Sequence, residues 1–429
     1  MQHRRYDLVV FGATGYLGSL VSNYLSANAP ATLRWAIAGR NAAKLRELSG
    51  RLQDAYPHLE APERVVSTLE IDDLDRMVSE TRLVLNTVGP FSKYGTPVVE
   101  ACIRQSTAYV DSTGEHTWSH EIAMALHDRA IVKRAAIIPH CAIESSPPDL
   151  MTYLLLRKIN EARLVPAGPL YFSIDHTWPG YSGGTVAAIL GVLSTYSLSQ
   201  INASSVPMAS CVPNSGSNFP HAISILPVRY DSFLGPVTFN PSAMADRWVV
   251  LRTWSLLQRF GAVEEKYGQR FSFQGYSRAP NVLQAWLSFL AVSFMTLFVI
   301  LLPPVRNLLA WLSPAPGTGP QVSREEKHYV EWKATLQAIP TTGGLKHASR
   351  ATGTMRINMD VYLCCALLVA EAALSAIEVL DSGEPSSLLT KLQGGVLTPT
   401  CLGMTYIDRL QKAGLDISIN LETSPKEKL

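Results

Sequence analysis

The stretch "DLVVFGATGYLGSLV", residues 7–21, decides the fold. It opens with four apolar β-formers, Leu8–Phe11, and a continuous apolar run of this length is typical of a strand buried on both faces. Glycines follow at three-residue spacing, and beyond them apolar residues recur with the period of a helix. A strand, a glycine-rich turn and a helix in this order are the context of a dinucleotide-binding fingerprint. The spacing is GxxGxxG, which is weak alone, so further signals have to support it.

Each glycine of this turn has its own expected role. Gly12 would permit the tight turn, Gly15 would let the backbone approach a pyrophosphate, and Gly18 would let the helix pack on the strand. The helix N-terminus would face the phosphates with free N–H groups and its positive dipole end. We therefore predict a cofactor-binding turn that consists of Gly12, Thr14, Gly15, Tyr16, Leu17 and Gly18.

The second strand indicates which dinucleotide binds. Residues 35–38 form a short apolar run, and NAD sites usually place an acid at the end of this strand to hold the ribose 2′-hydroxyl. Here that position holds Gly39 and Arg40, with Lys44 one helical turn later. Because a cation suits a 2′-phosphate, the sequence predicts NADPH as the cofactor. The alternative is an ordinary exposed arginine.

Two further strands place loops beside the nicotinamide. One strand covers residues 83–85, and another covers residues 108–110. Ligands of a doubly wound sheet lie beyond the carboxyl ends of its strands, so the residues that follow both strands belong to the predicted site. These residues are Asn86, Val88, Gly89, Pro90 and Asp111. A later strand at residues 137–138 ends at His140.

The order of these motifs resembles a known family. GATGYLG, AGR, NTVGPF, YG followed by PVVEAC, and YVDSTGE are similar to the saccharopine dehydrogenase-like oxidoreductases. The similarity continues through residues 143–150, 182–185, 244–257, 314–320 and 394–403, and so spans nearly the whole chain. It is nearest to the branch that includes trans-acting enoyl reductases of polyketide assembly and saccharopine dehydrogenase-like proteins of membranes or lipid droplets. In one departure, the Gly-Asp-Pro-Gly-Tyr segment of that branch is replaced by NMDVY, in which only Asp360 and Tyr362 match loosely.

The expected architecture is α/β with two domains. Residues 1–150 form an NADP-binding Rossmann domain with a doubly wound parallel sheet. Residues 151–429 form an α+β domain for substrate binding or dimerisation, with a mainly antiparallel sheet. Its strands are expected at residues 171–175, 329–339 and 351–359, and a helix at residues 364–380. Residues 207–220 are expected to form a loop, and the charged tail from residue 424 is expected to be disordered.

Composition excludes several function classes. The 429 residues include 37 basic and 35 acidic side chains, and no basic-aromatic array indicates a nucleic-acid partner. Six cysteines without a C-x-x-C pair indicate reduced thiols and an intracellular, cytoplasmic-face location. His116 and His120 have helical spacing, but a solvated helix face explains them better than a metal, and we predict none. A strand begins within seven residues of Met1, which leaves no room for a signal peptide.

One apolar block, residues 285–302, carries no charge over 18 residues. This length reaches the lower limit for crossing a bilayer core. Trp286 and Trp311 near its two ends suit a membrane interface, whereas three hydroxyl side chains and Pro303–Pro304 weaken a clean spanning helix. The sequence leaves open a membrane or lipid-droplet anchor, a buried helix or oligomer contact, and a true span.

The chemistry that NADPH implies is hydride transfer, for which the protein orients, polarises and protonates the substrate. The catalytic candidates are Tyr94, which follows Lys93 beside the nicotinamide loop, and Tyr181. No Tyr-x-x-x-Lys pair is present, so a short-chain dehydrogenase mechanism is not expected, and the alternative for Tyr94 is a packed tyrosine. Glu144 and Asp149 are expected to stabilise the domain junction or cap a helix.

Three functions follow from the residues and the resemblance. The first is an NADPH-dependent reductase of an enoyl group in a polyketide or lipid-like thioester, delivered in trans on a carrier protein. The second is a membrane- or lipid-droplet-associated NADP-binding protein with no oxidoreductase activity or a different one. The third is a saccharopine-type imine reductase, which needs clustered arginines for dicarboxylates and finds only Arg247 and Arg252. A homodimer is left open.

Overall fold

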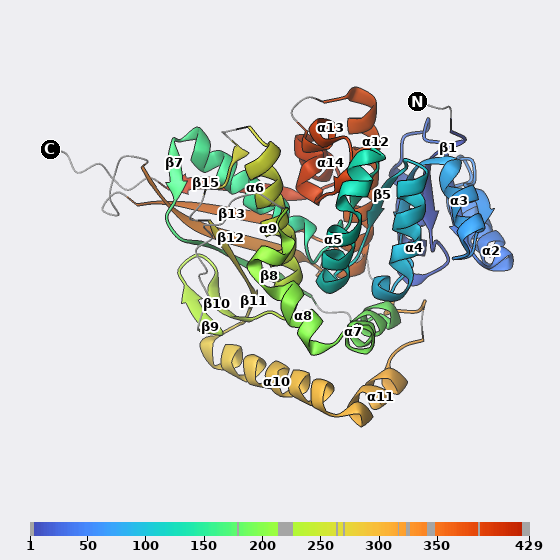
Figure 1. Cartoon of the computed structure of the whole chain (residues 1–429). Helices are drawn as coiled ribbons and strands as arrows, with labels where there is room; N and C mark the ends of the chain where they lie inside the picture. Colours follow the sequence, from blue (N-terminus) through green and yellow to red (C-terminus); the bar gives the residue numbers. More distant parts are fainter. Residues whose placement is uncertain are drawn as a thin grey trace.

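Two β-sheets form the frame of the molecule, with helices packed around and between them (Figure 1). The computed structural model describes residues 4–177, 180–212, 226–262, 265–268, 271–315, 317–322, 327–340, 348–384 and 387–422. The loop expected at residues 207–220 lies outside these residues from 213 onward, and so does the tail from residue 424.

The first sheet has seven parallel strands in the order β14-β6-β5-β4-β1-β2-β3. The central strand β1 pairs with β2 and β4, and Val10 lies opposite both Ile37 and Leu85. The predicted doubly wound parallel sheet is therefore confirmed. Its strands are β1 (Tyr6–Phe11), β2 (Trp35–Gly39), β3 (Glu63–Val66), β4 (Thr81–Asn86), β5 (Ala108–Asp111), β6 (Ala136–Ile138) and β14 (Gly395–Val396).

The sheet is completed by the C-terminal part of the chain. Strand β14 pairs with β6, and helix α12 (Val361–Ser382) packs on α1, β4 and β5. The division at residue 150 stays a prediction, but the seven-stranded sheet itself draws on residues far beyond it. The connecting helices are α1 (Tyr16–Asn28), α2 (Ala42–Ala55), α3 (Ile71–Ser79), α4 (Phe91–Arg104), α5 (His116–Val132) and α6 (Ser146–Glu161).

The second sheet is mixed and mostly antiparallel, as predicted. Its order is β15-β13-β12-β8-β11-β10-β9, β7 also pairs with β12, and only β8 and β11 run parallel. Helices α6 and α9 (Ala243–Phe260) pack on it. Its strands are β7 (Leu164–Pro166), β8 (Pro169–His176), β9 (Val228–Asp231), β10 (Gly235–Phe239), β11 (Ser272–Arg278), β12 (Val330–Pro340), β13 (Ser349–Ile357) and β15 (Asp416–Glu422).

The remaining helices connect the two sheets or lie at the surface. They are α7 (Gly183–Thr195), α8 (Leu198–Ser205), α10 (Val282–Leu301), α11 (Pro303–Leu312), α13 (Leu388–Leu392), α14 (Gly403–Lys412) and the 3₁₀ turns Pro207–Ser210 and Pro399–Leu402. Figure 1 shows α10 and α11 along one edge of the molecule, and α11 contacts α7.

Two of the described helices have the length and composition to cross a bilayer, and they differ in burial. The apolar window of α12 is 83% buried, whereas that of α10 is only 11% buried. Helices α7 and α8 would form a third candidate only if the pair, bent by 108°, counted as one span. Helix α12 is thus part of the protein core, and α10 carries the apolar block found in the sequence.

Candidate cofactor and substrate site

The glycine turn has the backbone that a dinucleotide requires. Gly12 has φ +87°, and a Cβ atom there would lie 2.8 Å from Thr87 Oγ1. A Cβ atom at Gly18 would lie 2.2 Å from the carbonyl oxygen of Gly12. At Gly15 the single neighbour of such an atom is that carbonyl oxygen, at 3.2 Å. The first and third glycines are therefore needed for packing, while the space above Gly15 is open.

Helix α1 presents free donors to that space. It begins at Tyr16, and Gly15 stands at the N-cap without a side chain to accept from the first N–H groups. Unpaired N–H groups at a helix N-terminus attract anions. The open cradle above Gly15 and these donors fit the pyrophosphate of a dinucleotide.

A buried hydrogen-bond network fixes the loops after β4, β5 and β6. Asp111 is fully buried and accepts from Tyr109 Oη at 2.8 Å and from the backbone N–H groups of Thr113 and His140, both at 3.0 Å. Burial raises the pKa of Asp111 to about 7. The network shapes the edge of the site, and a direct contact between Asp111 and the cofactor stays a prediction.

The predicted nicotinamide loop is held from both ends. Asn86 donates to Tyr109 Oη at 3.1 Å and accepts from the Val88 N–H at 3.0 Å. Glu115 accepts from the N–H of Phe91 at 2.6 Å, which secures the start of α4 just after Gly89 and Pro90. Helix α7 covers the loop, because a Cβ atom at Gly191 would lie 3.1 Å from Pro90 Cβ. The loop is thus rigid and closely packed under α7.

The two predicted 2′-phosphate cations are exposed at the end of β2. Arg40 follows the strand directly, and Lys44 lies in the first turn of α2, which Asn41 caps by accepting from the Lys44 N–H at 3.0 Å. Within the described part of the chain, neither side chain forms an ion pair or a hydrogen bond. Both charges are therefore available to an anionic group at this edge of the sheet.

Segments distant in the sequence meet at Tyr16, beside the glycine turn. Tyr16 donates to the carbonyl of Pro320 at 2.7 Å, and its ring packs edge-on against Tyr362, with ring centroids 5.1 Å apart. Tyr362 accepts from the Ser182 N–H at 2.7 Å and donates to the Gly180 carbonyl at 3.2 Å. The N-termini of α1, α7 and α12 thus meet at the cofactor turn. Sequence reasoning missed this role of Tyr362, for which the loosely matching NMDVY segment was the one signal.

The two candidate tyrosines lie in different surroundings. Tyr181 exposes 52% of its surface in the turn before α7, and burial raises the pKa of its hydroxyl, with smaller contributions from Glu144 and Tyr362. Tyr94 exposes 40% of its surface on α4, and no hydrogen bond holds its hydroxyl among the described residues. The structure therefore groups Tyr181, but not Tyr94, with other titratable side chains. Both stay predictions as catalytic residues.

Other polar residues from the sequence have structural partners. Asp149 is buried and accepts from Thr253 Oγ1 at 2.6 Å and from the Thr400 N–H at 2.9 Å, so it joins α6 to α9 and to a 3₁₀ turn as expected. His116 bonds Ser205 at 3.0 Å, and His120 bonds the backbone at residue 209 at 2.8 Å. In the described ranges, no group of three His, Cys, Asp or Glu side chains could hold a metal.

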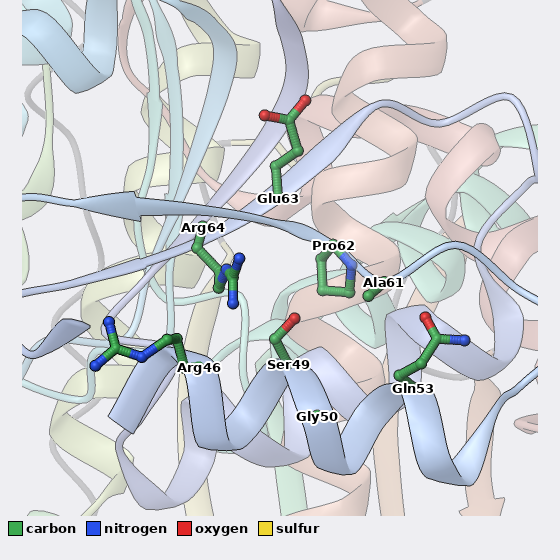
Figure 2. A pocket seen from close by; sticks show the side chains of 8 residues that line it. All are labelled: Arg46, Ser49, Gly50, Gln53, Ala61, Pro62, Glu63 and Arg64. Carbon is green, nitrogen blue, oxygen red and sulfur yellow. The ribbon is translucent and has the colours of Figure 1, made fainter. Parts of the chain in front are cut away.

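A surface depression between α2 and β3 is a separate feature. Figure 2 shows its lining, which comprises Arg46, Ser49, Gly50, Gln53, Ala61, Pro62, Glu63 and Arg64. It lies on the outer strand of the sheet and includes no residue of the glycine turn or of the loops after β4 and β5. We therefore do not assign it to the cofactor.

Comparison with known proteins agrees with this geometry. The family profile of the saccharopine dehydrogenase NADP binding domain matches residues 8–138. The trans-acting enoyl reductases of Mycobacterium leprae and Mycobacterium bovis are 31% and 30% identical to this chain, and each alignment covers 96% of this chain and 97% of the relative. The predicted resemblance, the NADP-binding domain and the NADPH cofactor are thereby confirmed.

A solved structure shows the same fold. Saccharopine dehydrogenase (L-Glu forming) from Saccharomyces cerevisiae aligns over 97% of this chain and 99% of its own, with a TM-score of 0.51. The sequence identity is 12%, so this match supports the two-sheet architecture alone.

Proposed function

We propose an activity for this chain from its family. The chain belongs to the saccharopine dehydrogenase-like oxidoreductases, and trans-acting enoyl reductases are among its relatives. The chain is an NADP-dependent oxidoreductase. Its proposed reaction is the reduction of the carbon–carbon double bond of an enoyl thioester. The proposed substrate is a polyketide or lipid-like acyl chain, presented in trans by a carrier protein.

The protein's own groups have defined tasks in this reaction. NADPH supplies a hydride to the β-carbon, which leaves negative charge on the thioester carbonyl oxygen. The open turn at Gly15 and the N-terminus of α1 would hold the pyrophosphate, and Arg40 with Lys44 would hold the 2′-phosphate. The loop of Val88, Gly89 and Pro90 would bound the nicotinamide. Donors aimed at the developing oxyanion are typically worth roughly 3–4 kcal/mol each in such sites.

The geometry favours this substrate over a dicarboxylate imine. Arg247 donates to the Ser205 carbonyl at 2.6 Å. Arg252 is fully buried and donates to the carbonyls of Val396 and Ser210. Both arginines singled out in the sequence are thus bound to backbone oxygens, which supports ranking saccharopine-type reduction last.

The activity is tested by a cofactor-oxidation assay on a panel of substrates. Enoyl thioesters of several chain lengths are compared with saccharopine and with simple imines. We expect NADPH oxidation with the thioesters, at a rate that depends on chain length. Oxidation with saccharopine or imines alone would contradict the proposal.

The cofactor assignment has its own test in Arg40→Ala. Charge-assisted hydrogen bonds contribute roughly 1.5–3 kcal/mol, so the variant should bind NADPH about 10- to 100-fold more weakly and bind NADH unchanged. Arg46→Ala, at an exposed position of the nearby helix α2, is the matched control and should leave both affinities unchanged. Equal affinity of the wild type for the two cofactors would refute the role of Arg40.

We also propose that α10 and α11 hold the enzyme on a lipid surface. The exposed side chains of α10 include Leu283, Leu287, Phe294 and Leu301, which expose 70%, 57%, 57% and 61% of their surface. Helix α11 adds Trp311, at 77%. Soluble proteins rarely expose a contiguous apolar surface of this kind.

The width of the exposed face favours lipid over a protein partner. The exposed large apolar side chains of α10 are spread over an arc of its circumference that is bounded by Val282 and Met295. At about 100° per residue, this arc covers roughly 220°. A helix that docks on protein needs an apolar stripe of roughly 100°. Lipid tails can cover the wider arc, and α10 contains no charged residue.

This surface is connected to the cofactor site. The chain leaves α11 at Leu312, and a Cβ atom at Gly183 of α7 would lie 2.4 Å from the Pro314 carbonyl oxygen. Further along, the same segment packs on Tyr16 through Gly319. A lipid-bound α10–α11 pair would thus bring the active site close to the surface where acyl chains reside.

Flotation with phosphatidylcholine vesicles tests the lipid surface. The wild type should float, and Leu287→Asp/Phe294→Asp should stay soluble while it binds NADPH normally, since Asp costs roughly 2.5–3.5 kcal/mol per residue at bilayer depth. Val132→Asp, at an exposed apolar position of α5, is the control and should still float. A wild type that never floats would contradict the proposal.

A further inference from the structure

Asp246 is a buried carboxyl group that structural roles leave unexplained. It lies in the first turn of α9, exposes 2% of its surface, and has no hydrogen-bond partner for Oδ1 in the described part of the chain. No cation pairs with it there either. Burial raises its pKa well above the ordinary value, and the nearby Glu144 carboxyl contributes in the same direction. A buried carboxyl without a compensating charge holds its proton.

Glu144 connects this group to the candidate site. A Cβ atom at Gly114 would lie 2.0 Å from Glu144 Oε2, so the carboxyl rests against the loop that follows β5. Ser242, the N-cap of α9, donates to Glu144 Oε1 at 3.4 Å. Residue 144 is exposed to solvent, whereas Asp246 is buried in the first turn of α9, the helix that Ser242 caps. One carboxyl group thus lies at the surface and the other in the interior, close enough for Glu144 to raise the pKa of Asp246.

Glu144 lies beside the edge of the first sheet where the nicotinamide is expected. It follows β6 and contacts the loop after β5, and both strands end at the edge of the sheet that also carries the nicotinamide loop. Tyr181, from the turn before α7, is close enough for the charge of Glu144 to raise the pKa of its hydroxyl. Glu144 therefore lies between the cofactor edge of the first sheet and the turn before α7.

We propose that Glu144 is the acid of the reaction and that Asp246 is its positioning residue, which rests on the enoyl reductase activity proposed above. The hydride adds to the β-carbon, and the electron pair of the double bond forms an enolate. The α-carbon then takes the proton of Glu144, the enolate returns to the thioester carbonyl, and a Cα–H bond has formed. Glu144 is left as a carboxylate and regains a proton from water, so the products are the saturated thioester and NADP⁺.

The charge environment supports a protonated Glu144. The titratable groups that face it are Tyr181 before α7, Asp246 on α9 and the Cys365 thiol on α12. None of them carries positive charge, and the loss of water around its carboxyl group raises the pKa of Glu144 by more than the Ser242 hydrogen bond lowers it. Because the acid has to be protonated, activity should fall as the pH rises through the pKa of Glu144.

Glu144→Gln tests the acid directly. We expect kcat to fall about 10²- to 10⁴-fold, the usual contribution of a general acid, with unchanged NADPH affinity. In deuterated water the wild type should deliver deuterium to one face of the α-carbon, and the variant should deliver it to both. The alkaline limb of the pH profile should disappear in Glu144→Gln and stay at the same pH in Asp246→Asn, because a protonated Asp246 carries no charge that could raise the pKa of Glu144. Glu60→Gln, at an exposed site, is the control.

Two outcomes would overturn the inference. One is a Glu144→Gln variant that keeps facial selectivity and the alkaline limb while the wild type reduces enoyl thioesters. The other is independent of turnover and applies even if no thioester is reduced. Infrared difference spectra between the wild type and Asp246→Asn should show a protonated carboxyl at neutral pH, and the absence of that band refutes the inference. Failure of the reductase activity with the band present would contradict only the proposed function.

Discussion

Helices α10 and α12 are nearly equal in hydropathy and opposite in environment. Their apolar windows have mean hydropathy 2.0 and 2.1, yet 11% of the first and 83% of the second is buried. Both would pass for membrane spans by length and composition. An apolar sequence window therefore predicts that a helix avoids water. Only the tertiary structure shows whether the rest of the protein shields it.

Polar groups distinguish the two helices further. Helix α12 contains Glu371, whose carboxylate accepts from Tyr24 at 2.7 Å and from Arg409 at 2.7 Å. The helix ends at Gly383 in the left-handed conformation, with φ +61°. Such specific pairing is expected of a core helix. Helix α10 is fixed mainly near its start, where Thr238 donates to the Ala285 carbonyl at 2.8 Å.

Introducing a charge should have the largest effect, and the effect should differ between α12 and α10. Leu368→Asp places an unpaired carboxylate at a fully buried position of α12, and we expect a loss of about 4 kcal/mol or more in the free energy of unfolding. Leu287→Asp on α10 should cost under about 0.5 kcal/mol in the absence of lipid, because its side chain is already in water. Urea denaturation of both variants measures the difference, and similar losses would mean that α10 is also core.

Truncation of a leucine should have an intermediate effect. Leu367→Ala on α12 removes a buried side chain and should destabilise the protein by roughly 2–5 kcal/mol. The matched variant Leu283→Ala on α10 should stay within about 0.5 kcal/mol of the wild type. Thermal unfolding of the two variants measures the difference between the helices. A Leu283→Ala variant less stable than Leu367→Ala would contradict the exposed position of α10.

Much of the fold could be predicted because its signals are local. The strand, glycine turn and helix around Gly12–Gly18, the strands before Arg40 and Asn86, and strands β8, β12 and β13 of the second sheet follow from periodicity, whereas β7, β9, β10, β11 and β15 were not predicted. Strand β3 was not predicted, since its four residues, Glu63–Val66, lie at the edge and alternate poorly. Strand β14 was not predicted either, because two residues carry no period and their partner is β6.

The candidate site could be predicted from the sequence only where its residues lie close together in the chain. Residues of the cofactor turn lie within one motif, so the sequence could name them together. The grouping of Tyr16 with Tyr362 and Gly319 depends on contacts between segments some 300 residues or more apart in the chain. Likewise, Asp246 is unusual only because folding buries it without a partner, and no pattern in the sequence records burial of that kind.

The smallest effect concerns the buried ion pair of α12. Glu371→Gln keeps an acceptor for Tyr24 but removes the charge that faces Arg409, and we expect a loss of roughly 1–3 kcal/mol. The partly exposed Arg409 can still pair with Glu378 at 3.2 Å, which limits the loss. Denaturation at neutral pH measures it. An unchanged stability would show that packing alone, without the ion pair, accounts for the position of α12.

The proposed reaction is the reduction by NADPH of the double bond of an enoyl thioester bound to this protein. The most direct measurement uses NADPH deuterated at the transferable position of its nicotinamide and follows the product by mass spectrometry and NMR. We expect one deuterium at the β-carbon of the saturated thioester for each NADPH oxidised. NADPH that binds tightly but transfers no deuterium to a thioester of any length would contradict it.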